Sequence, residues 1–256
     1  MAQAPVPKAP VIVLVRPQLV ENIGTTARAM ANCALDDLRL VAPRDPWPLG
    51  SVHQTRMAAA ASGADDVLKG ARVFDSVAEA VADLQYVYAT TARPHDLAHV
   101  LHTPRSAAAD MRTRTLHAER VGVLFGPERT GLVNEDLVRA NAVITAPLNP
   151  AFMSLNLAQA VLMVAYEWRM AGDTTPAVQI QTGASVPAAH GEVENFFRRL
   201  ESELDAAGFF VAPSMRPTMT KNLRAFIGRA VPTDQEIRTW HGVLSALVTG
   251  PRRGKE

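Results

Sequence analysis

The sequence predicts an α/β protein with a mostly parallel sheet, helices on both faces of that sheet, and a small helical extension. Residues 11–171 alternate between short apolar runs and longer segments with helical periodicity, as in chains that form parallel sheets. Several runs, such as Val11–Val15, are continuously apolar and β-branched, which is typical of strands covered on both faces. After residue 187 the periodicity is only helical.

The strands and helices of the first part follow from these patterns in order. Thr103-Pro104 predicts a helix start with proline in its first turn, and Ser76 to Glu79 matches a capping box. Strands are expected at Val11 to Val15, Leu38 to Val41, Tyr86 to Thr90, Val121 to Phe125 and Ala142 to Ala146. Helices are expected at 22–33, 54–61, from Ser76 onward, at 104–117, at 134–139 and at 154–171.

Residues 172–187 differ from the segments on either side, because they hold several Gly, Thr and Pro residues and little periodicity. We therefore predict a main domain at 1–171, a linker at 172–187 and a helical C-terminal domain at 188–256. One apolar stripe at helical spacing comprises Val193, Phe196, Phe197, Leu200 and Leu204. A second follows the capping box at Thr233 to Glu236 and comprises Ile237, Trp240, Val243, Leu244 and Leu247.

Composition excludes several classes of protein. The net charge of +1 over 256 residues argues against nucleic-acid binding by bulk charge, although a local basic surface remains compatible with it. The lone Cys33 excludes an intramolecular disulfide framework and a cysteine-rich zinc site. The first ten residues lack a secretory pattern, and no run of about 18 apolar residues predicts a membrane span. We expect a soluble, cytoplasmic protein.

Charge is unevenly distributed within the helical extension. Residues 192–205 carry five acidic and two basic side chains, whereas 216–256 carry eight basic and three acidic ones. The basic segment suits contacts to a phosphate backbone. The alternative is a solvated helix face followed by a frayed terminus.

Three short segments resemble parts of one site, since each follows an apolar run and leads into a helical pattern. They are Asn22 to Arg28, Phe125 to Leu132 and Ser154 to Ala160. Loops that leave the carboxyl ends of strands carry the chemistry of open α/β proteins. Together these loops offer an arginine, a glutamate, a serine and two asparagines, which suits a polar substrate held beside a cofactor.

Each segment also has a purely structural interpretation. Gly24 is expected near a helix start, where free N–H groups can bind an anion, but Asn22 could be a plain N-cap and Arg28 a surface residue. Glu128 and Arg129 could form an exposed ion pair of little consequence. Ser154 could simply cap the helix that follows, with Asn156 one turn inside it.

Other sites are disfavoured by the sequence. His95, His99 and His102 have the spacing of a metal-binding helix face, but His95 follows Pro94 and no fourth ligand is evident. Ser154 has no G-x-S-x-G context, and neither a G-x-G-x-x-G motif nor a P-loop occurs. No metal site is therefore predicted.

Taken in order, the three segments resemble the motifs of the SpoU-type branch of the SPOUT methyltransferases. They read Asn22-Ile-Gly-Thr-Thr-Ala-Arg28, Leu124-Phe-Gly-Pro-Glu-Arg-Thr-Gly-Leu132 and Ser154-Leu-Asn-Leu-Ala-Gln-Ala160. The segment from Ala89 to Arg93, the run Ala165-Tyr-Glu167 and the helical tail resemble the TrmJ-type enzymes most. Those enzymes methylate the ribose 2′-OH of nucleotide 32 in the tRNA anticodon loop.

This resemblance implies a parallel sheet whose C-terminal part forms a trefoil knot, a feature that ordinary chain rules would not predict. It implies a homodimer that acts on tRNA, with the active site where Arg28 of one subunit meets the knot of the other. S-adenosylmethionine would be the cofactor, and its pocket would be lined by Thr90, Thr91, Ala92, Gly126, Ala146, Met153, Ser154 and Leu155.

The same resemblance assigns the catalytic residues. Arg28 would hold a phosphate and the 2′-oxygen and stabilise developing negative charge, since a guanidinium is a poor base. Asn22 and Asn156 would orient Arg28 and the ribose, Glu128 would fix the loop, and Ser154 would assist on the substrate side. Pro127 departs from the basic residue found there in many relatives, which weakens transfer of a phosphate contact. Ribosomal RNA is the rival substrate, and a knotted RNA-binding protein without methyl transfer is the rival class.

Overall fold

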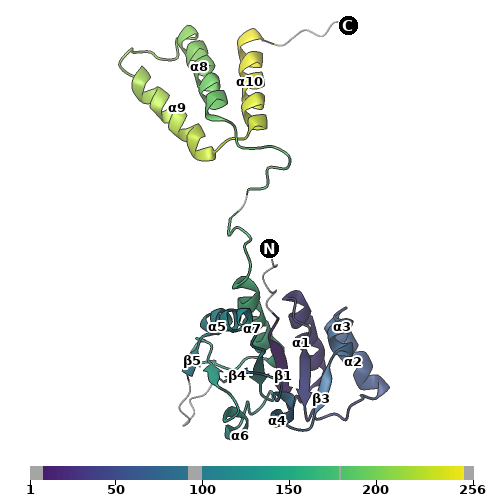
Figure 1. Cartoon of the computed structure of the whole chain (residues 1–256). Helices are drawn as coiled ribbons and strands as arrows, with labels where there is room; N and C mark the ends of the chain where they lie inside the picture. The colour runs from purple at the N-terminus through teal and green to yellow at the C-terminus, as the bar shows by residue number, and fades with distance from the viewer. Residues whose placement is uncertain (1–7, 92–99, 179, 251–256) are drawn as a thin grey trace, which may run out of the picture. The chain divides into compact units, whose positions relative to one another are not determined.

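The computed structural model describes residues 8–91, 100–178 and 180–250, and its described strands form one parallel seven-stranded sheet (Figure 1). Each pair of neighbouring strands runs in the same direction. The strands are β1 (Val11–Val15), β2 (Leu38–Val41), β3 (Arg72–Phe74), β4 (Tyr86–Thr90), β5 (Val100–His102), β6 (Val121–Phe125) and β7 (Ala142–Ile144). Their order across the sheet is β3-β2-β1-β6-β4-β7-β5.

The predicted parallel sheet is confirmed, and β1, β2, β4 and β6 have the expected ends. β7 is shorter than expected because it ends at Ile144. The two edge strands β3 and β5 were missed. Each has only three residues, which are exposed or half-buried, so neither shows the continuous apolar run that marks a strand buried on both faces.

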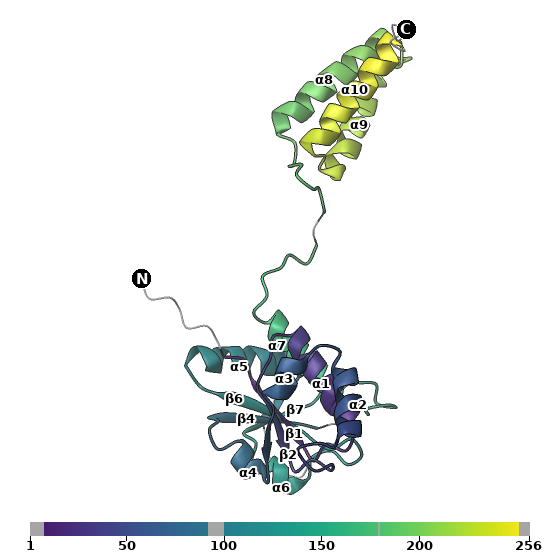
Figure 2. The ribbon, with the colours of Figure 1, turned by 90° about the vertical axis from the view of Figure 1, so that its right-hand side faces the viewer.

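Helices cover both faces of the sheet, as Figure 2 shows. Side chains of β1 alternate between the layers: Ile12 and Leu14 pack with the larger one, and Val13 packs with the smaller one. The larger layer contains α1 (Val20–Asn32), α2 (Ser51–Ala61), α3 (Asp65–Lys69), α5 (Pro104–Leu116) and α7 (Leu157–Met170). The smaller layer contains α4 (Val77–Ala80) and α6 (Asn134–Leu137).

Helix α1 begins two residues earlier than expected, and this changes the role of Gly24. The glycine lies inside the helix rather than at its start, so its N–H is not free to bind an anion. A Cβ atom at Gly24 would lie 2.2 Å from the carbonyl oxygen of Met57 on α2. Gly24 therefore permits close packing of two helices, and its predicted place in an anion-binding turn is wrong.

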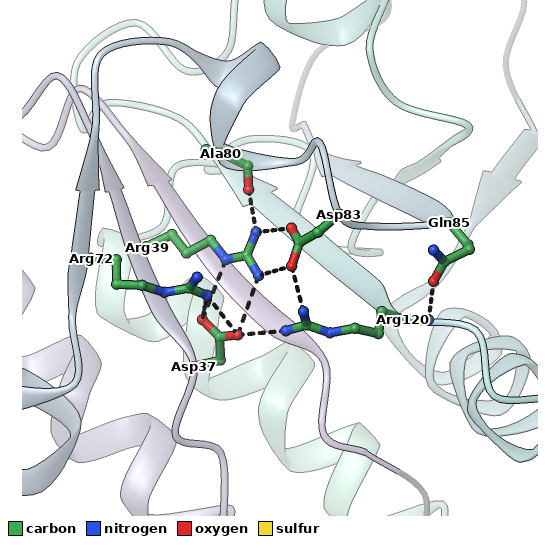
Figure 3. Close-up of polar contacts among 7 residues, drawn as sticks. All are labelled: Asp37, Arg39, Arg72, Ala80, Asp83, Gln85 and Arg120. Carbon is green, nitrogen blue, oxygen red and sulfur yellow. Dashed lines mark hydrogen bonds and ion pairs between the residues drawn. The ribbon is translucent and has the colours of Figure 1, made fainter.

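Charged residues gather at the amino edge of the sheet, the edge at which the strands begin (Figure 3). The Arg39 side chain is 1% exposed, and its guanidinium donates to the carbonyl of Ala80 at 2.6 Å and to the carboxylates of Asp37 and Asp83. Arg120 bridges the same two carboxylates, at 2.9 Å to Asp37. Arg72 also donates to Asp37 at 2.9 Å. These ion pairs join the starts of β2, β3, β4 and β6.

The chain divides into two compact units, Met1–Thr175 and Pro176–Glu256. The second unit contains α8 (His190–Ala206), α9 (Arg216–Ala230) and α10 (Asp234–Thr249), with Phe196, Phe197 and Ile237 at its core. Val186 and Pro187, which close the predicted linker, pair with the turn before α10. Within the described residues, no helix combines the length and apolar character needed to span a membrane.

Two arginines of the basic segment form ion pairs with the acidic segment of the helical extension. Arg216 contacts Glu201 and Asp205, and Arg224 contacts Glu194 and Glu201. Hydrogen bonds from Arg224 also lower the pKa of the Glu194 carboxyl. Two of the eight basic residues that suggested a phosphate-binding surface are therefore matched with carboxylates of α8.

Candidate active site

A cavity of about 470 Å³ opens at the carboxyl ends of β4, β6 and β7. Strands β4 and β6 pair directly, and β7 flanks β4 on the other side, so the loops that follow these strands meet at one edge. The volume lies within the range of about 300–1,000 Å³ that is usual for small-molecule sites. Its apolar walls include Leu132, Ile144, Leu148, Leu155 and Met163.

The residues predicted to contact a cofactor line this cavity wherever the structure describes them. They are Thr90, Thr91, Gly126, Ala146, Met153, Ser154 and Leu155. Ala92 lies outside the described residues. At Gly126, a Cβ atom would lie 2.3 Å from the backbone nitrogen of Leu132, because the loop folds back on itself there. Only glycine allows this close approach of the loop to its own start.

Glu128 ties the β6 loop to the start of α1. Its carboxylate accepts hydrogen bonds from the backbone N–H of Gln18 at 2.9 Å and of Leu19 at 3.2 Å. It also accepts one from the Asn22 side-chain amide at 2.7 Å. A carboxylate at a helix N-terminus is stabilised by the free N–H groups and by the helix dipole. The exposed Glu128–Arg129 pair considered above is thus not what holds this side chain.

The two predicted asparagines continue from Glu128 in a chain of hydrogen bonds. The Asn156 amide donates to the Asn22 side-chain oxygen at 3.0 Å, so Glu128, Asn22 and Asn156 form one continuous polar line. Asn22 lies in the third position of α1 and is buried, with 7% of its surface exposed. The alternative interpretation of Asn22 as a helix N-cap is therefore wrong.

Asn156, rather than Ser154, is the N-cap of α7. Its side-chain oxygen accepts from the N–H of Ala158 at 2.9 Å, and Gln159 completes a capping box. The helix starts at Leu157, three residues later than predicted, so Asn156 does not sit one turn inside it. This geometry leaves the amide nitrogen of Asn156 free to donate to Asn22. Ser154 is exposed and lines the cavity.

Arg28 lies on the same face of the molecule as both asparagines but not in the main cavity. A second hollow of about 330 Å³ is lined by Asn22, Arg28 and Asn156, together with Thr25 and Gln159. Arg28 is exposed, and among the described residues no hydrogen bond or ion pair engages its guanidinium. The site thus has two compartments that share the Glu128–Asn22–Asn156 chain.

Sequence reasoning missed some residues that build this arrangement. The backbone N–H groups of Gln18 and Leu19 carry no side-chain signal, so only the three-dimensional structure reveals their contact with Glu128. Arg129 and Thr130 also line the cavity. Of the three histidines considered as metal ligands, His102 lies in β5 and the other two fall outside the described residues, among which no metal-binding cluster occurs.

Comparison with known proteins finds relatives that match most of the chain. Residues 9–166 match the family model of the SpoU rRNA Methylase family. A curated relative from Pectobacterium atrosepticum, tRNA (cytidine/uridine-2′-O-)-methyltransferase TrmJ, is 34% identical over 92% of this chain and 95% of its own length. The crystal structure of TrmJ from Z. mobilis ZM4 is 48% identical, with a TM-score of 0.77 over 93% of this chain and 99% of that one. A probable methylase family protein from Haemophilus influenzae Rd KW20 is 30% identical with a TM-score of 0.58.

Proposed function

Because this chain belongs to the SpoU rRNA Methylase family, we propose that it methylates a ribose 2′-OH in the anticodon loop of tRNA, at nucleotide 32. The chain is an RNA methyltransferase, and its methyl donor is S-adenosylmethionine. The observation that carries the proposal is the hydrogen-bond chain from Glu128 through Asn22 to Asn156. It joins the cofactor-sized cavity to the hollow that contains Arg28.

The main cavity fits S-adenosylmethionine in size and in chemistry. Apolar side chains such as Leu132 and Met163 suit a purine ring, and the polar groups of Thr91 and Ser154 suit the sugar and amino-acid parts. Gly126 keeps the loop close enough for backbone groups to reach a ligand. The bound cofactor supplies an electrophilic methyl group on a sulfonium sulfur.

The residues of the chain then act on the nucleophile. Arg28 binds the phosphate beside the target ribose and stabilises the negative charge that develops on the 2′-oxygen. Asn22 and Asn156 hold α1 and the start of α7 in fixed register, and Glu128 holds the start of α1 against the β6 loop. Ser154 contacts the ribose from the cavity side. Alignment of the ribose 2′-oxygen with the methyl group accounts for much of the rate of methyl transfer, as in other reactions whose two reactants are bound in a fixed orientation.

We further propose that two copies of the chain assemble around this site. Helix α7 exposes Leu162, Tyr166 and Met170 by 41–55%, and their spacing of four residues puts them on one helix face. Leu162 also lines the hollow that holds Arg28. A second copy packed on this face would cover the apolar stripe and bring its own cavity to Arg28. The knotted path of the β6 and β7 loops stays a prediction.

Methylation of a tRNA transcript in vitro, with the modified nucleotide located by mass spectrometry, tests the proposal. We expect one methyl group at nucleotide 32, and none when that nucleotide is 2′-deoxy. The variant Arg28→Ala should lose transfer, whereas Arg105→Ala, at an exposed arginine of α5, should retain it. Methylation of ribosomal RNA alone would replace the tRNA assignment. Binding of tRNA without any transfer, by cofactor-loaded protein, would leave only an RNA-binding role.

A further inference from the structure

Arg16 and Asp136 form an ion pair that none of the proposed catalytic steps uses. The guanidinium of Arg16 binds both carboxylate oxygens of Asp136, with one N–O distance of 3.2 Å. The Asp136 side chain is only 5% exposed, and it also accepts from the backbone N–H of Val133 at 3.1 Å. A carboxylate buried to this extent needs its cation, because few other groups compensate the charge.

The backbone of Arg16 is fixed as firmly as its side chain. The residue follows β1 directly, with a φ of 49° in the left-handed region that non-glycine residues rarely adopt. Its N–H donates to the carbonyl of Val41 at the end of β2, at 2.8 Å. Arg16 is therefore held by β2 through its backbone and by α6 through its guanidinium. A left-handed backbone conformation at a non-glycine residue persists where several surrounding contacts hold it in place.

The Arg16–Asp136 pair lies beside the contacts that hold Glu128. Arg16 precedes Gln18 and Leu19, whose N–H groups bind Glu128, and Asp136 follows the loop that carries Glu128. The β1 loop and the β6 loop are thus joined at two points. One point is the contact of Glu128 with the start of α1, and the other is the Arg16–Asp136 pair. Two fixed points constrain both the separation and the relative rotation of the loops.

We propose that Arg16 is a positioning residue for methyl transfer, acting through Asp136 to hold the β1 and β6 loops in register. Through that register it fixes the Glu128–Asn22–Asn156 chain and, at the far side of that chain, Arg28. Arg16 touches neither substrate nor cofactor in this role. The inference rests on the proposed function for its kinetic consequences, but the constraint on the loops does not depend on that function.

The kinetic test compares Arg16→Met with Arg16→Lys in the full-length chain. We expect Arg16→Met to lower kcat by tenfold or more while the KM values for tRNA and S-adenosylmethionine stay within about twofold, because binding is left intact and alignment is lost. Arg16→Lys should restore most of kcat. The control is Arg44→Met, which removes an exposed arginine from the loop after β2. Arg44 pairs with Asp45 and has no contact with Glu128, so this variant should leave kcat unchanged.

A second measurement is independent of catalysis. Hydrogen–deuterium exchange should increase in Arg16→Met at the amides of Gln18 and Leu19 and in residues 126–132, but not in β2 or in the helical extension. If exchange increases in Arg16→Met but the wild-type chain transfers no methyl group, the result would support the role of the Arg16–Asp136 pair in holding the loops. The same result would contradict the proposed function. Unchanged exchange and unchanged kcat would overturn the role of Arg16. A fall in kcat that only tracks a fall in Tm would also overturn it.

If Arg16→Met fails to fold, the double variant Arg16→Met with Asp136→Asn can be tested instead. It removes the buried charge of Asp136 together with the Arg16 guanidinium that compensates it. The proposal expects this double variant to fold and to show the same tenfold loss of kcat. A folded double variant with wild-type kcat would overturn it.

Discussion

Replacing Arg39 by methionine tests whether ion pairs at the amino edge of the sheet hold the first unit together. The methionine keeps an apolar stem in the buried position, but it removes the guanidinium donors of Arg39 that reach Ala80, Asp37 and Asp83. The carbonyl of Ala80 would lose its guanidinium partner in a buried position. The two carboxylates would keep Arg120.

The expected loss of stability follows from how buried each partner is. Removing one member of a fully buried pair costs about 3–5 kcal/mol, because the other charge is left without compensation. Here Asp83 is 43% and Asp37 is 22% exposed, so water compensates part of that loss. We expect the free energy of unfolding of the first unit to fall by about 2–3 kcal/mol, which is roughly a 30- to 150-fold rise in its opening constant.

Hydrogen–deuterium exchange of the full chain measures this loss, since each peptide reports its own unit. Amides of β2 and β6 should exchange faster in Arg39→Met, while those of α8 and α10 should not change and serve as an internal reference. Arg72→Met is the matched control, because its side chain is 50% exposed and should contribute at most about 1 kcal/mol. Equal effects of the two substitutions would refute the argument that the burial of Arg39 makes it important.

The same network predicts a pH dependence. Hydrogen bonds from Arg39, with the charges of Arg39 and Arg120, lower the pKa of the Asp83 carboxyl to about 2. A carboxyl with a lowered folded-state pKa contributes stability above its unfolded pKa of about 4 and loses that contribution as the pH falls toward 2. The stability of the first unit should therefore decrease between pH 4 and pH 2. That decrease should be smaller in Arg39→Met. If the free energy of unfolding of Arg39→Met depended on pH as strongly as that of the wild type, the Arg39–Asp83 contact would not be the cause of the pH dependence.

Further predictions concern the site and the second unit. Arg28→Ala should leave S-adenosylmethionine affinity unchanged by calorimetry and lower methyl transfer by orders of magnitude. Gly126→Ala should weaken cofactor binding by about tenfold or more, because the new methyl group meets backbone in its own loop. Asn156→Ala should destabilise the chain by about 1 kcal/mol through loss of a cap, whereas Asn156→Asp should keep the cap and still lose the donor to Asn22. Truncation after residue 171 should raise the KM for tRNA more than the KM for the cofactor. If the truncated and full-length chains had the same KM for tRNA, the extension would not be used for tRNA.

The sheet could be predicted because burial on both faces leaves a direct mark on composition. Strands β1 and β6 consist of residues that are buried throughout, and their boundaries follow from the sequence. Edge strand β5 is not buried in this way, since Val100 and Leu101 are mostly exposed, and its boundaries do not follow from the sequence. Helix α9 was not predicted, although Met219, Leu223 and Ile227 recur at helical spacing and are half-buried in the structure.

The residues of the site could be identified by type, but their contacts could not be derived. Asn22, Glu128 and Asn156 lie in segments that follow apolar runs, and the resemblance to the SpoU-type methyltransferases implies their roles. That Glu128 binds the backbone of Gln18 and Leu19 depends on β1 and β6 being neighbours in the sheet, which is a long-range property. The cap of α7 was misplaced because Ser154 and Asn156 are both good N-cap residues, and only the backbone geometry decides between them.

Arginines that carboxylates already pair can be separated from Arg28 by role, since Arg16 at the carboxyl edge and Arg39 at the amino edge are both matched with carboxylates. At the amino edge, Arg39 and Arg120 are matched with carboxylates, so the charges stabilise strand starts and have little capacity left for a ligand. At the carboxyl edge, Glu128 is occupied by N–H groups and an amide rather than by a cation. Arg28 is exposed, and none of the carboxylates in the described residues pairs with it. An uncompensated guanidinium beside a chain of fixed amides is suited to an anionic partner from outside the chain, and an RNA phosphate is such a partner.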